Sequence, residues 1–190
     1  ADTSTADAIL TIPQPSATNH KGGTLYFDNS GRLLISLGDG GSTPETAQDN
    51  NSLRGKILRI DPSTDAYPSD PAKDYSIPTA NPFASGSGGL PEIYASGLGL
   101  PDGIAFDDNG DLFVAGAGQI WVVVPEEAPD ARPFTTTGAL DGPASLAFGF
   151  GTNRDRSRLY FTNFGYPVIG SGTTVASVKV GISGAKLFAP

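Results

Sequence analysis

The sequence predicts an all-β fold, namely a β-propeller of four-stranded antiparallel blades with about three blades in the chain. One hairpin pattern recurs three times, and the 190 residues include 25 Gly and 16 Pro, which suits short strands joined by many turns. Hydrophobic residues make up 38% of the chain, enough for a core, and no segment shows a convincing amphipathic helix. We therefore expect one propeller-type domain over residues 1–190.

The recurring pattern is an alternating strand that ends in Phe, a polar turn, and a second alternating strand. It occupies residues 25–39, 104–118 and 146–165. In the first two copies the turns read Asp-Asn-Ser-Gly and Asp-Asp-Asn-Gly, residue types that favour tight hairpin connections. The acidic residues in these turns are interpreted as turn formers, although a D-x-N-x-D run can also hold calcium.

Further strands are expected after each hairpin. Third strands are predicted at 56–61, 120–125 and 175–180, and fourth strands at 132–138 and 185–190. The predicted blades span 19–92, 93–138 and 139–190, with a long loop at 62–89 that is rich in Pro, Ser, Asp and Gly. The segments LLISLG, LFVAGA and LYFTNF are expected nearest the propeller axis, because small residues fit where strands converge. The leading segment 9–15 is expected to be the outer strand of a further blade.

Composition argues against several kinds of partner. The chain has 12 basic and 20 acidic residues and a formal net charge of −8, which disfavours nucleic acid and anionic membranes. It has no cysteine, so disulfides and thiolate metal sites are excluded. No apolar run approaches the length of a membrane span, and the opening ADTSTADAIL lacks the basic and apolar regions of a signal peptide.

His20 is the only histidine, so any histidine-dependent chemistry must use it. It begins a series of short motifs in the first half of the chain. These are N-H-x-G-G at 19–23, G-D-G-G at 38–41, A-Q-D at 47–49, L-x-G-K-I-L-R-I-D at 53–61, Y-x-I-P at 75–78, N-P-F at 81–83 and E-I-Y-A-S-G-L at 92–98. Residues 9–100 thereby resemble the soluble PQQ-dependent glucose and sorbosone (aldose sugar) dehydrogenases, which are six-bladed propellers.

The resemblance implies roles for two residues and a defect in the cofactor site. His20 matches the family's general base, which takes the proton of the C1 hydroxyl, and Asp39 matches the Asp that orients this base. The family continues with Arg-Asn-Pro, where Arg and Asn contact PQQ, whereas this chain has Gly99-Leu100-Pro101. No match to the family's calcium ligands is found. The resemblance implies PQQ and calcium as possible cofactors, and the missing residues imply that the cofactor site is impaired.

Residues 101–190 are similar to a second family of six-bladed propellers, the SMP-30/gluconolactonases. The similarity rests on P-D-G-I-A-F-D-D-N-G-D-L-F-V-A at 101–115, I-W-V-V at 120–123, P-A-S-L-A-F-G at 143–149 and L-Y-F-T-N at 159–163. In that family the Asp of the P-D-G turn, here Asp102, helps to hold a divalent cation that polarises a lactone carbonyl and activates water. The partner Glu and Asn of that metal site are not found.

Three functions follow as alternatives. The first is a PQQ-dependent sugar dehydrogenase-like oxidoreductase with His20 as base, the second a metal-dependent lactone hydrolase with Asp102 on the ion, and the third a non-catalytic binding or assembly module. The expected partner is a small sugar or lactone. Since three blades do not close a ring, we expect a homodimer or larger assembly unless the chain is a fragment. The family resemblance implies a periplasmic or secreted location.

Overall fold

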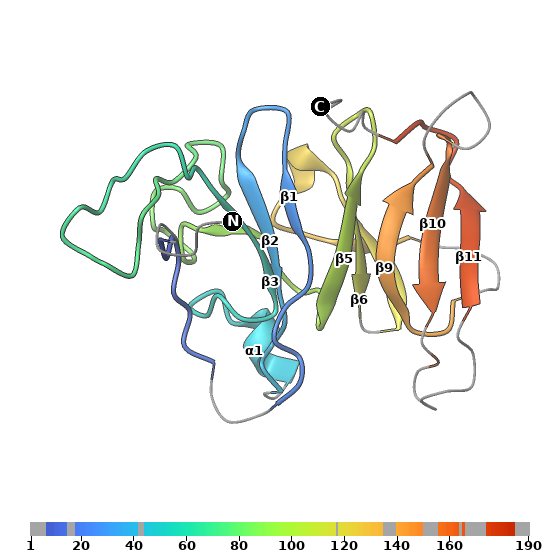
Figure 1. Ribbon diagram of the computed structural model, residues 1–190, viewed down its shortest axis with the longest axis horizontal. Coiled ribbons are helices and arrows are strands. Elements are labelled where there is room, and N and C mark those ends of the chain that lie inside the picture. The colour runs from blue at the N-terminus through green and yellow to red at the C-terminus, as the bar shows by residue number, and fades with distance from the viewer. Residues whose placement is uncertain are drawn as a thin grey trace.

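The computed structural model describes residues 7–14, 18–41, 44–116, 118–134, 140–149, 156–163, 165 and 174–184. These residues form three antiparallel sheets that stand side by side and fan out across the molecule, in chain order (Figure 1). This arrangement confirms the predicted all-β propeller architecture. None of the described helices is long and apolar enough to cross a membrane.

The first sheet consists of β1 (Leu25–Phe27), β2 (Leu33–Leu37), β3 (Lys56–Ile60) and β4 (Ile93–Ala95), paired in that order. Helix α1 (Pro44–Gln48) lies between β2 and β3. Since β4 pairs with β3, the first sheet extends beyond the boundary expected at residue 92.

The second sheet is equally regular, with β5 (Pro101–Phe106), β6 (Leu112–Gly116), β7 (Gln119–Val123) and β8 (Arg132–Pro133) in sequential order. The short 3-10 helix η2 (Pro125–Glu127) connects β7 to β8. The third sheet contains β9 (Pro143–Phe148), β10 (Arg158–Asn163) and β11 (Thr174–Lys179). The fourth strand expected at 185–190 lies outside the described residues.

The first two hairpins have the same turn, hydrogen bond for hydrogen bond. Asp28 Oδ1 accepts the backbone N–H groups of Ser30 and Arg32, at 2.8 and 2.9 Å. Asp107 Oδ1 accepts those of Asn109 and Asp111, at 2.9 and 3.0 Å. In each turn the Asp side chain thus accepts hydrogen bonds from backbone N–H groups that have no backbone acceptor in a tight turn. The Asx residues in both turns predict this role.

The expectation that the second strand of each unit lies nearest the axis is wrong. The segments LLISL, LFVAG and RLYFTN are β2, β6 and β10, each paired on both sides within its sheet, while β1, β5 and β9 are edge strands. The second and third sheets come close at their first strands, since a Cβ on Gly103 of β5 would lie 2.7 Å from Ser145 Cα of β9. Gly38, which follows β2, and Gly116, which ends β6, instead lie against the main chains of His20 and Leu100.

Residues 9–14, the described part of the leading segment, do not form the outer strand of a further blade. Leu10 makes an isolated antiparallel bridge with Lys73 of the long loop, and Asp74 N donates to Ile9 O at 2.8 Å. Ile9 and Leu10 pack against Leu33, Ile60 and Tyr75. The leading segment therefore pairs with the long loop and packs against β2 and β3 of the first sheet.

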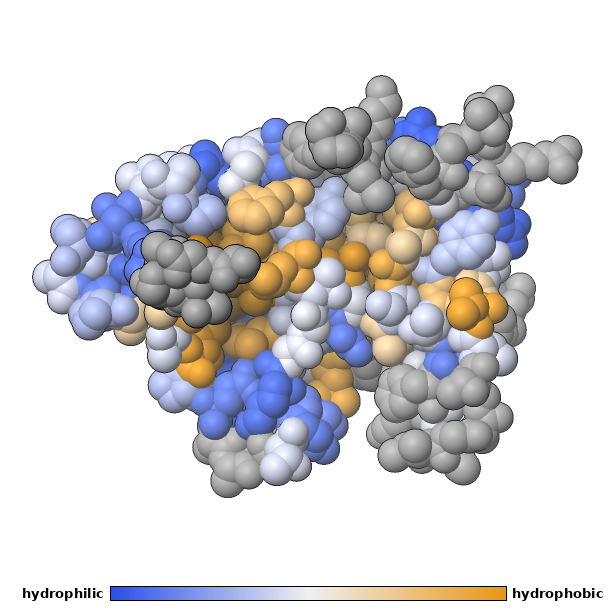
Figure 2. All heavy atoms as spheres, viewed as in Figure 1, coloured by the Kyte–Doolittle hydropathy of each residue, from blue (hydrophilic) through white to orange (hydrophobic). Residues whose placement is uncertain are grey.

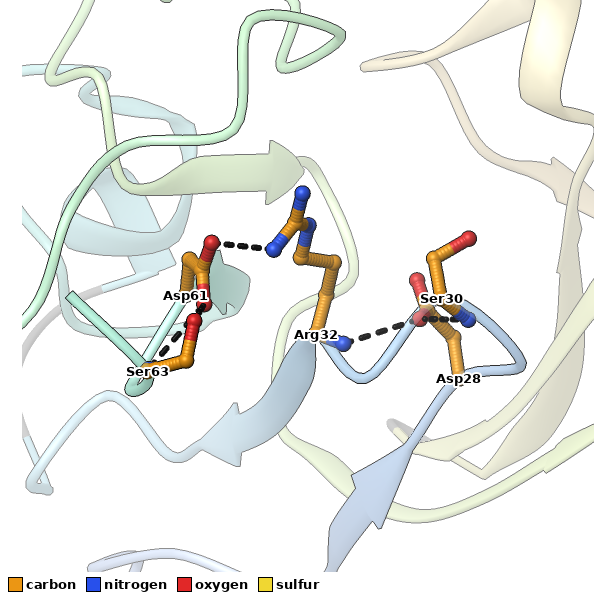
Figure 3. A network of polar contacts seen from close by, with 5 residues as sticks. All are labelled: Asp28, Ser30, Arg32, Asp61 and Ser63. Atoms are coloured by element: carbon orange, nitrogen blue, oxygen red, sulfur yellow. Dashed lines mark hydrogen bonds and ion pairs between the residues drawn. The ribbon is translucent and has the colours of Figure 1, made fainter.

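The long loop is fixed to the first hairpin at its start (Figure 3). Arg32, which follows the Asp28 turn, forms a salt bridge with Asp61, and Asp61 Oδ1 accepts the hydroxyl of Ser63 at 2.6 Å. The charged guanidinium of Arg32 and the two bonds from Ser63 lower the pKa of Asp61, with the Ser63 contribution the larger.

Two apolar clusters join the three sheets. Tyr26 of the first sheet packs on Phe106 of the second, with ring centroids 4.9 Å apart, and Phe113 of the second packs on Phe148 of the third at 5.4 Å. Apolar side chains gather along the middle of the molecule, while the long loop on the left is mainly hydrophilic (Figure 2). The core thus lies between the sheets, as in a propeller.

Candidate functional site

The candidate site lies where β2 ends and is built around His20 and Asp39. His20 Nδ1 lies 3.0 Å from Asp39 Oδ1. The Asp39 side chain is only 8% exposed, whereas that of His20 is 38% exposed. An ionised carboxylate can only accept hydrogen bonds, so Nδ1 is the donor in this contact. The structure therefore brings together the two residues that the sequence pairs as base and orienting acid.

Backbone contacts hold this pair in place. Gly40 N donates to His20 O at 2.8 Å, and Gly41 N donates to Asp39 Oδ1 at 2.9 Å. His20 has φ of 56°, the left-handed region, and is the one non-glycine residue in the described chain with a positive φ. Such a conformation costs about 1–3 kcal/mol and persists only where surrounding contacts impose it. The contacts from the glycine turn are those that impose it here.

Gly38 allows the two loops to meet. A Cβ at this position would overlap the main-chain oxygen of His20. The glycine in the G-D-G-G motif is therefore required by a close approach between backbones. The G-D-G-G turn thus supplies both the Asp39 carboxylate and the space for the histidine loop.

The exposed imidazole can thus receive a ligand while its other nitrogen stays fixed.

Asp102, the predicted metal ligand, lies at the same end of the molecule. Its main-chain oxygen accepts the Ser36 hydroxyl at 2.6 Å, which joins β5 to the end of β2. Asp102 is the one exposed residue of β5, where Pro101 and Gly103 on either side are buried. Although it is exposed, the surrounding protein displaces enough water to raise the pKa of its carboxyl. We call the end of the molecule that carries His20, Asp39 and Asp102 the His20 pole.

The segment that should contact PQQ carries no donor side chains. Gly99 has φ of 70° and no side chain, and Leu100 is apolar. The main-chain oxygen of Leu100 lies against Gly116, which has no Cβ to obstruct it. Residues 99 and 100 therefore offer neither the guanidinium nor the amide that the family resemblance places there, and an impaired PQQ site stays a prediction.

The described residues also contain no group of three His, Asp or Glu side chains placed to hold a metal ion. Asp102 is therefore not part of such a group of three in this part of the chain. Its role as a metal ligand stays a prediction, as do the roles of His20 and Asp39 in catalysis.

Several motif residues turn out to support the fold. Lys56 is fully buried, and its Nζ donates to the main-chain oxygens of Thr46, Ala47 and Arg54 at 3.0, 2.8 and 3.0 Å. Burial lowers the pKa of Lys56 to about 8. The lysine thus ties α1 to β3, a role that the motif spacing alone did not reveal.

A second buried network holds the long loop against β4. Tyr75 donates its hydroxyl to Glu92 Oε1 at 2.6 Å, and Lys73 Nζ lies 2.9 Å from the same oxygen. Burial acts to raise the pKa of Glu92, but the bonds from Tyr75 and Lys73 outweigh it, so this pKa is lowered. Asn81 acts similarly, since its amide donates to the main-chain oxygens of Arg59 and Pro91.

Fold and site together define a propeller protein with a histidine–carboxylate pair at one pole. Comparison with known proteins then gives the family. The model of the glucose/sorbosone dehydrogenase family matches residues 3–120, and the chain belongs to this family. The match includes His20, Asp39 and Asp102.

Two relatives and one solved structure show the extent of the similarity. The HIPL2 protein of Arabidopsis thaliana is 39% identical over 115 residues, which are 56% of this chain and 16% of that protein. Aldose sugar dehydrogenase YliI of Escherichia coli K12 is 40% identical over 96 residues, 50% of this chain and 23% of that protein. The PQQ-bound form of the aldose sugar dehydrogenase from Streptomyces coelicolor has the same fold, with a TM-score of 0.57 and 19% identity over 89% of this chain and 51% of that one.

The chain therefore spans less than a quarter of the length of these two relatives and about half of the solved structure. What those proteins bind or oxidise is a property of the longer proteins.

Proposed function

We propose that this chain carries the base-bearing part of a PQQ-dependent sugar dehydrogenase-like oxidoreductase with an impaired cofactor site. The observation that supports the proposal is the 3.0 Å contact between His20 Nδ1 and the buried Asp39 carboxylate, in a chain of the glucose/sorbosone dehydrogenase family. The substrate in this proposal is a small sugar. A periplasmic or secreted location is part of the same proposal and rests on the family resemblance.

The chain's own contribution is proton transfer. Asp39 fixes the Nδ1–H tautomer of His20 and stabilises the imidazolium that forms when Nε2 accepts a hydroxyl proton from the sugar. The half-exposed ring can meet a ligand, while the buried carboxylate keeps the ring in one orientation. PQQ, when bound, would supply the electron acceptor, and no step through it follows from the described residues.

Sugar-dependent dye reduction in the presence of PQQ and calcium tests this proposal. The wild-type chain should reduce the dye, and His20→Gln should lower the rate by about 10²- to 10⁴-fold, the usual contribution of a general base. Asp39→Asn should lower it at least about tenfold, because an amide can stabilise the wrong tautomer. Asp65→Asn is the control. Asp65, on the long loop, accepts the backbone N–H two residues further on, as Asp39 does, and its replacement should leave the rate unchanged.

Two results would contradict the proposal. One is a wild-type chain without sugar-dependent reduction at saturating PQQ and calcium. The other is a rate that His20→Gln leaves unchanged.

The lactone hydrolase is retained as the second candidate because Asp102 is exposed at the His20 pole. In this alternative a divalent cation at Asp102 would polarise a lactone carbonyl. A series of calcium, magnesium, manganese and zinc ions added to a lactone hydrolysis assay tests it. Hydrolysis that depends on one of these ions and is lost in Asp102→Asn would favour the hydrolase over the dehydrogenase.

A further inference from the structure

Asp102 stands out because of its position within β5. Pro101 pairs with Gly116 and Ile104 with Val114, so β5 has one more residue than β6 over this stretch, an irregularity of the β-bulge kind. Bulges redirect side chains and are common beside functional sites. Here the strand is buried from Gly103 to Ala105, and Asp102 alone is exposed. The bulge thus turns one carboxylate out of a buried strand.

The neighbouring backbone leaves room for this carboxylate. A Cβ on Gly23 would lie 2.7 Å from Asp102 Oδ1 and 2.7 Å from Ser36 Oγ. Any side chain at position 23 would therefore have to displace the carboxylate or the hydroxyl. The second glycine of the N-H-x-G-G motif gives Asp102 its space.

Ser36 fixes Asp102 relative to the histidine loop. Its hydroxyl donates to Asp102 O at 2.6 Å and accepts Thr24 N at 2.7 Å, and its main-chain oxygen accepts Gly23 N at 3.2 Å. Gly38, which contacts the main chain of His20, is only two residues further on, a distance of about 7 Å along extended chain. The carboxylate and the imidazole are therefore held on segments that the buried residues Ser36 and Gly38 bring together.

The Asp102 carboxylate is available to a ligand. Within the described part of the chain, its oxygens form no hydrogen bond or ion pair, although its main-chain oxygen is bonded to Ser36. An ionised carboxylate only accepts hydrogen bonds. It therefore suits a ligand that brings hydroxyl donors and opposes a ligand that brings a second negative charge.

We propose that Asp102 is a specificity-determining residue of the His20 pole, whose carboxylate accepts hydrogen bonds from the hydroxyl groups of a neutral sugar and disfavours sugars that carry a carboxylate. This inference rests on the proposed function. It assigns Asp102 to the substrate and gives a physical basis for choosing among sugars.

Competition between a neutral and an acidic sugar tests the proposal. Calorimetry or NMR titration of the isolated chain with D-glucose and with D-glucuronate gives two dissociation constants without any need for catalysis. Glucuronate should bind more weakly than glucose at low salt, by about fourfold if the dielectric between two like charges roughly 5 Å apart is that of bulk water and by up to about 300-fold if it is that typical of a protein surface. The ratio should fall at high salt, because added ions screen exposed charges.

Asp102→Asn keeps the shape of the side chain and removes its charge. The ratio of the two dissociation constants should approach one in this variant and lose its dependence on salt. Asp65→Asn changes the net charge of the chain by the same amount from an exposed position on the long loop, and should keep the wild-type ratio.

The outcomes are distinguishable. If glucose binds but Asp102→Asn leaves the ratio unchanged, the role of Asp102 is wrong while the proposed function stands. If neither sugar shifts the signals of His20 or Gly23, both the proposed function and the role of Asp102 are overturned.

Discussion

The main-chain oxygen of His20 lies against Gly38, in the space that a Cβ on residue 38 would occupy. This contact sets the distance between the histidine loop and the G-D-G-G turn. It explains why the turn that supplies Asp39 begins with a residue that has no side chain.

Gly38→Ala should therefore destabilise the protein by about 1–3 kcal/mol, the usual cost of forcing extra atoms into a packed site. The displaced loop should also move His20 away from Asp39. Denaturant unfolding measures the first effect, and the NMR signals of the His20 ring measure the second.

Gly22→Ala provides the matched control. A Cβ there would meet its nearest neighbour, Ser36 O, at 3.5 Å, which is ordinary van der Waals contact. This variant should unfold within about 0.5 kcal/mol of the wild type. Equal stabilities for the two alanine variants would show that the close approach at Gly38 is not a constraint.

Local sequence patterns predicted the hairpins because a turn is determined by a few neighbouring residues. The Asp-x-x-Gly composition anticipated the hydrogen bonds that Asp28 and Asp107 accept from their own turns. The pairing of His20 with Asp39 was accessible only through resemblance to a family, since 19 residues separate the two and no periodicity connects them.

Contacts between distant segments could not be predicted in this way. Ser36 and Asp102 are 66 residues apart, and nothing in either segment signals that the serine hydroxyl joins two sheets. Leu10 matched the pattern of an outer strand but pairs with the long loop, because that loop offers both a backbone partner and the apolar surface around Tyr75. Register and contacts of this kind depend on the assembled sheets.

Lys56 should make stability depend on pH in the alkaline range. Its folded pKa of about 8 lies below the ordinary value of 10.5, so between these values the unfolded chain binds more protons than the folded one. The free energy of unfolding contributed by this group should therefore rise with pH, by about 2 kcal/mol between pH 8 and pH 10. Lys56→Met should lack that rise, as measured by denaturant unfolding at both pH values.

The difference between the wild type and Lys56→Met isolates this group from other residues that titrate in the same range. Lys179→Met at the exposed end of β11 serves as the control and should follow the wild type. Identical pH profiles for the wild type and Lys56→Met would contradict the prediction.

Glu92 should make stability fall in acid. Its pKa is lowered from 4.5 in the folded protein, so its contribution is present above that value and is lost as the pH falls through the folded pKa. Glu92→Gln should reduce the steepness of acid unfolding. At neutral pH it should lower the free energy of unfolding by about 1–3 kcal/mol, because Lys73 and Tyr75 lose a charged acceptor.

Glu127→Gln is the matched control, since this carboxylate is 58% exposed and lies 3.6 Å from Arg132 at the surface. It should change the stability by less than about 1 kcal/mol at neutral pH, as is usual for exposed ion pairs. An acid unfolding curve that Glu92→Gln leaves as steep as in the wild type would show that the buried network does not control acid stability.

The edge strand β1 should promote self-association. Leu25 and Phe27 are 65% and 50% exposed on the same face of this strand, next to an unpaired backbone edge. In the third sheet, Val175 of β11 is 75% exposed, next to a backbone edge that is likewise unpaired among the described strands. The apolar strip formed by Leu25 and Phe27 is therefore one physical reason to expect the predicted homodimer or larger assembly.

Light scattering at micromolar concentration should accordingly give a mass above the 19.5 kDa of one chain. Replacing Leu25 and Phe27 together by Thr should shift the distribution toward the single chain, because Thr keeps β propensity while removing apolar area from the strip. Ile182→Thr changes an exposed apolar residue in the segment after β11, away from β1, and should leave the mass unchanged. A wild-type chain that stays folded at 19.5 kDa would show that Leu25 and Phe27 are tolerated in water and that the arc of three sheets is stable without a partner.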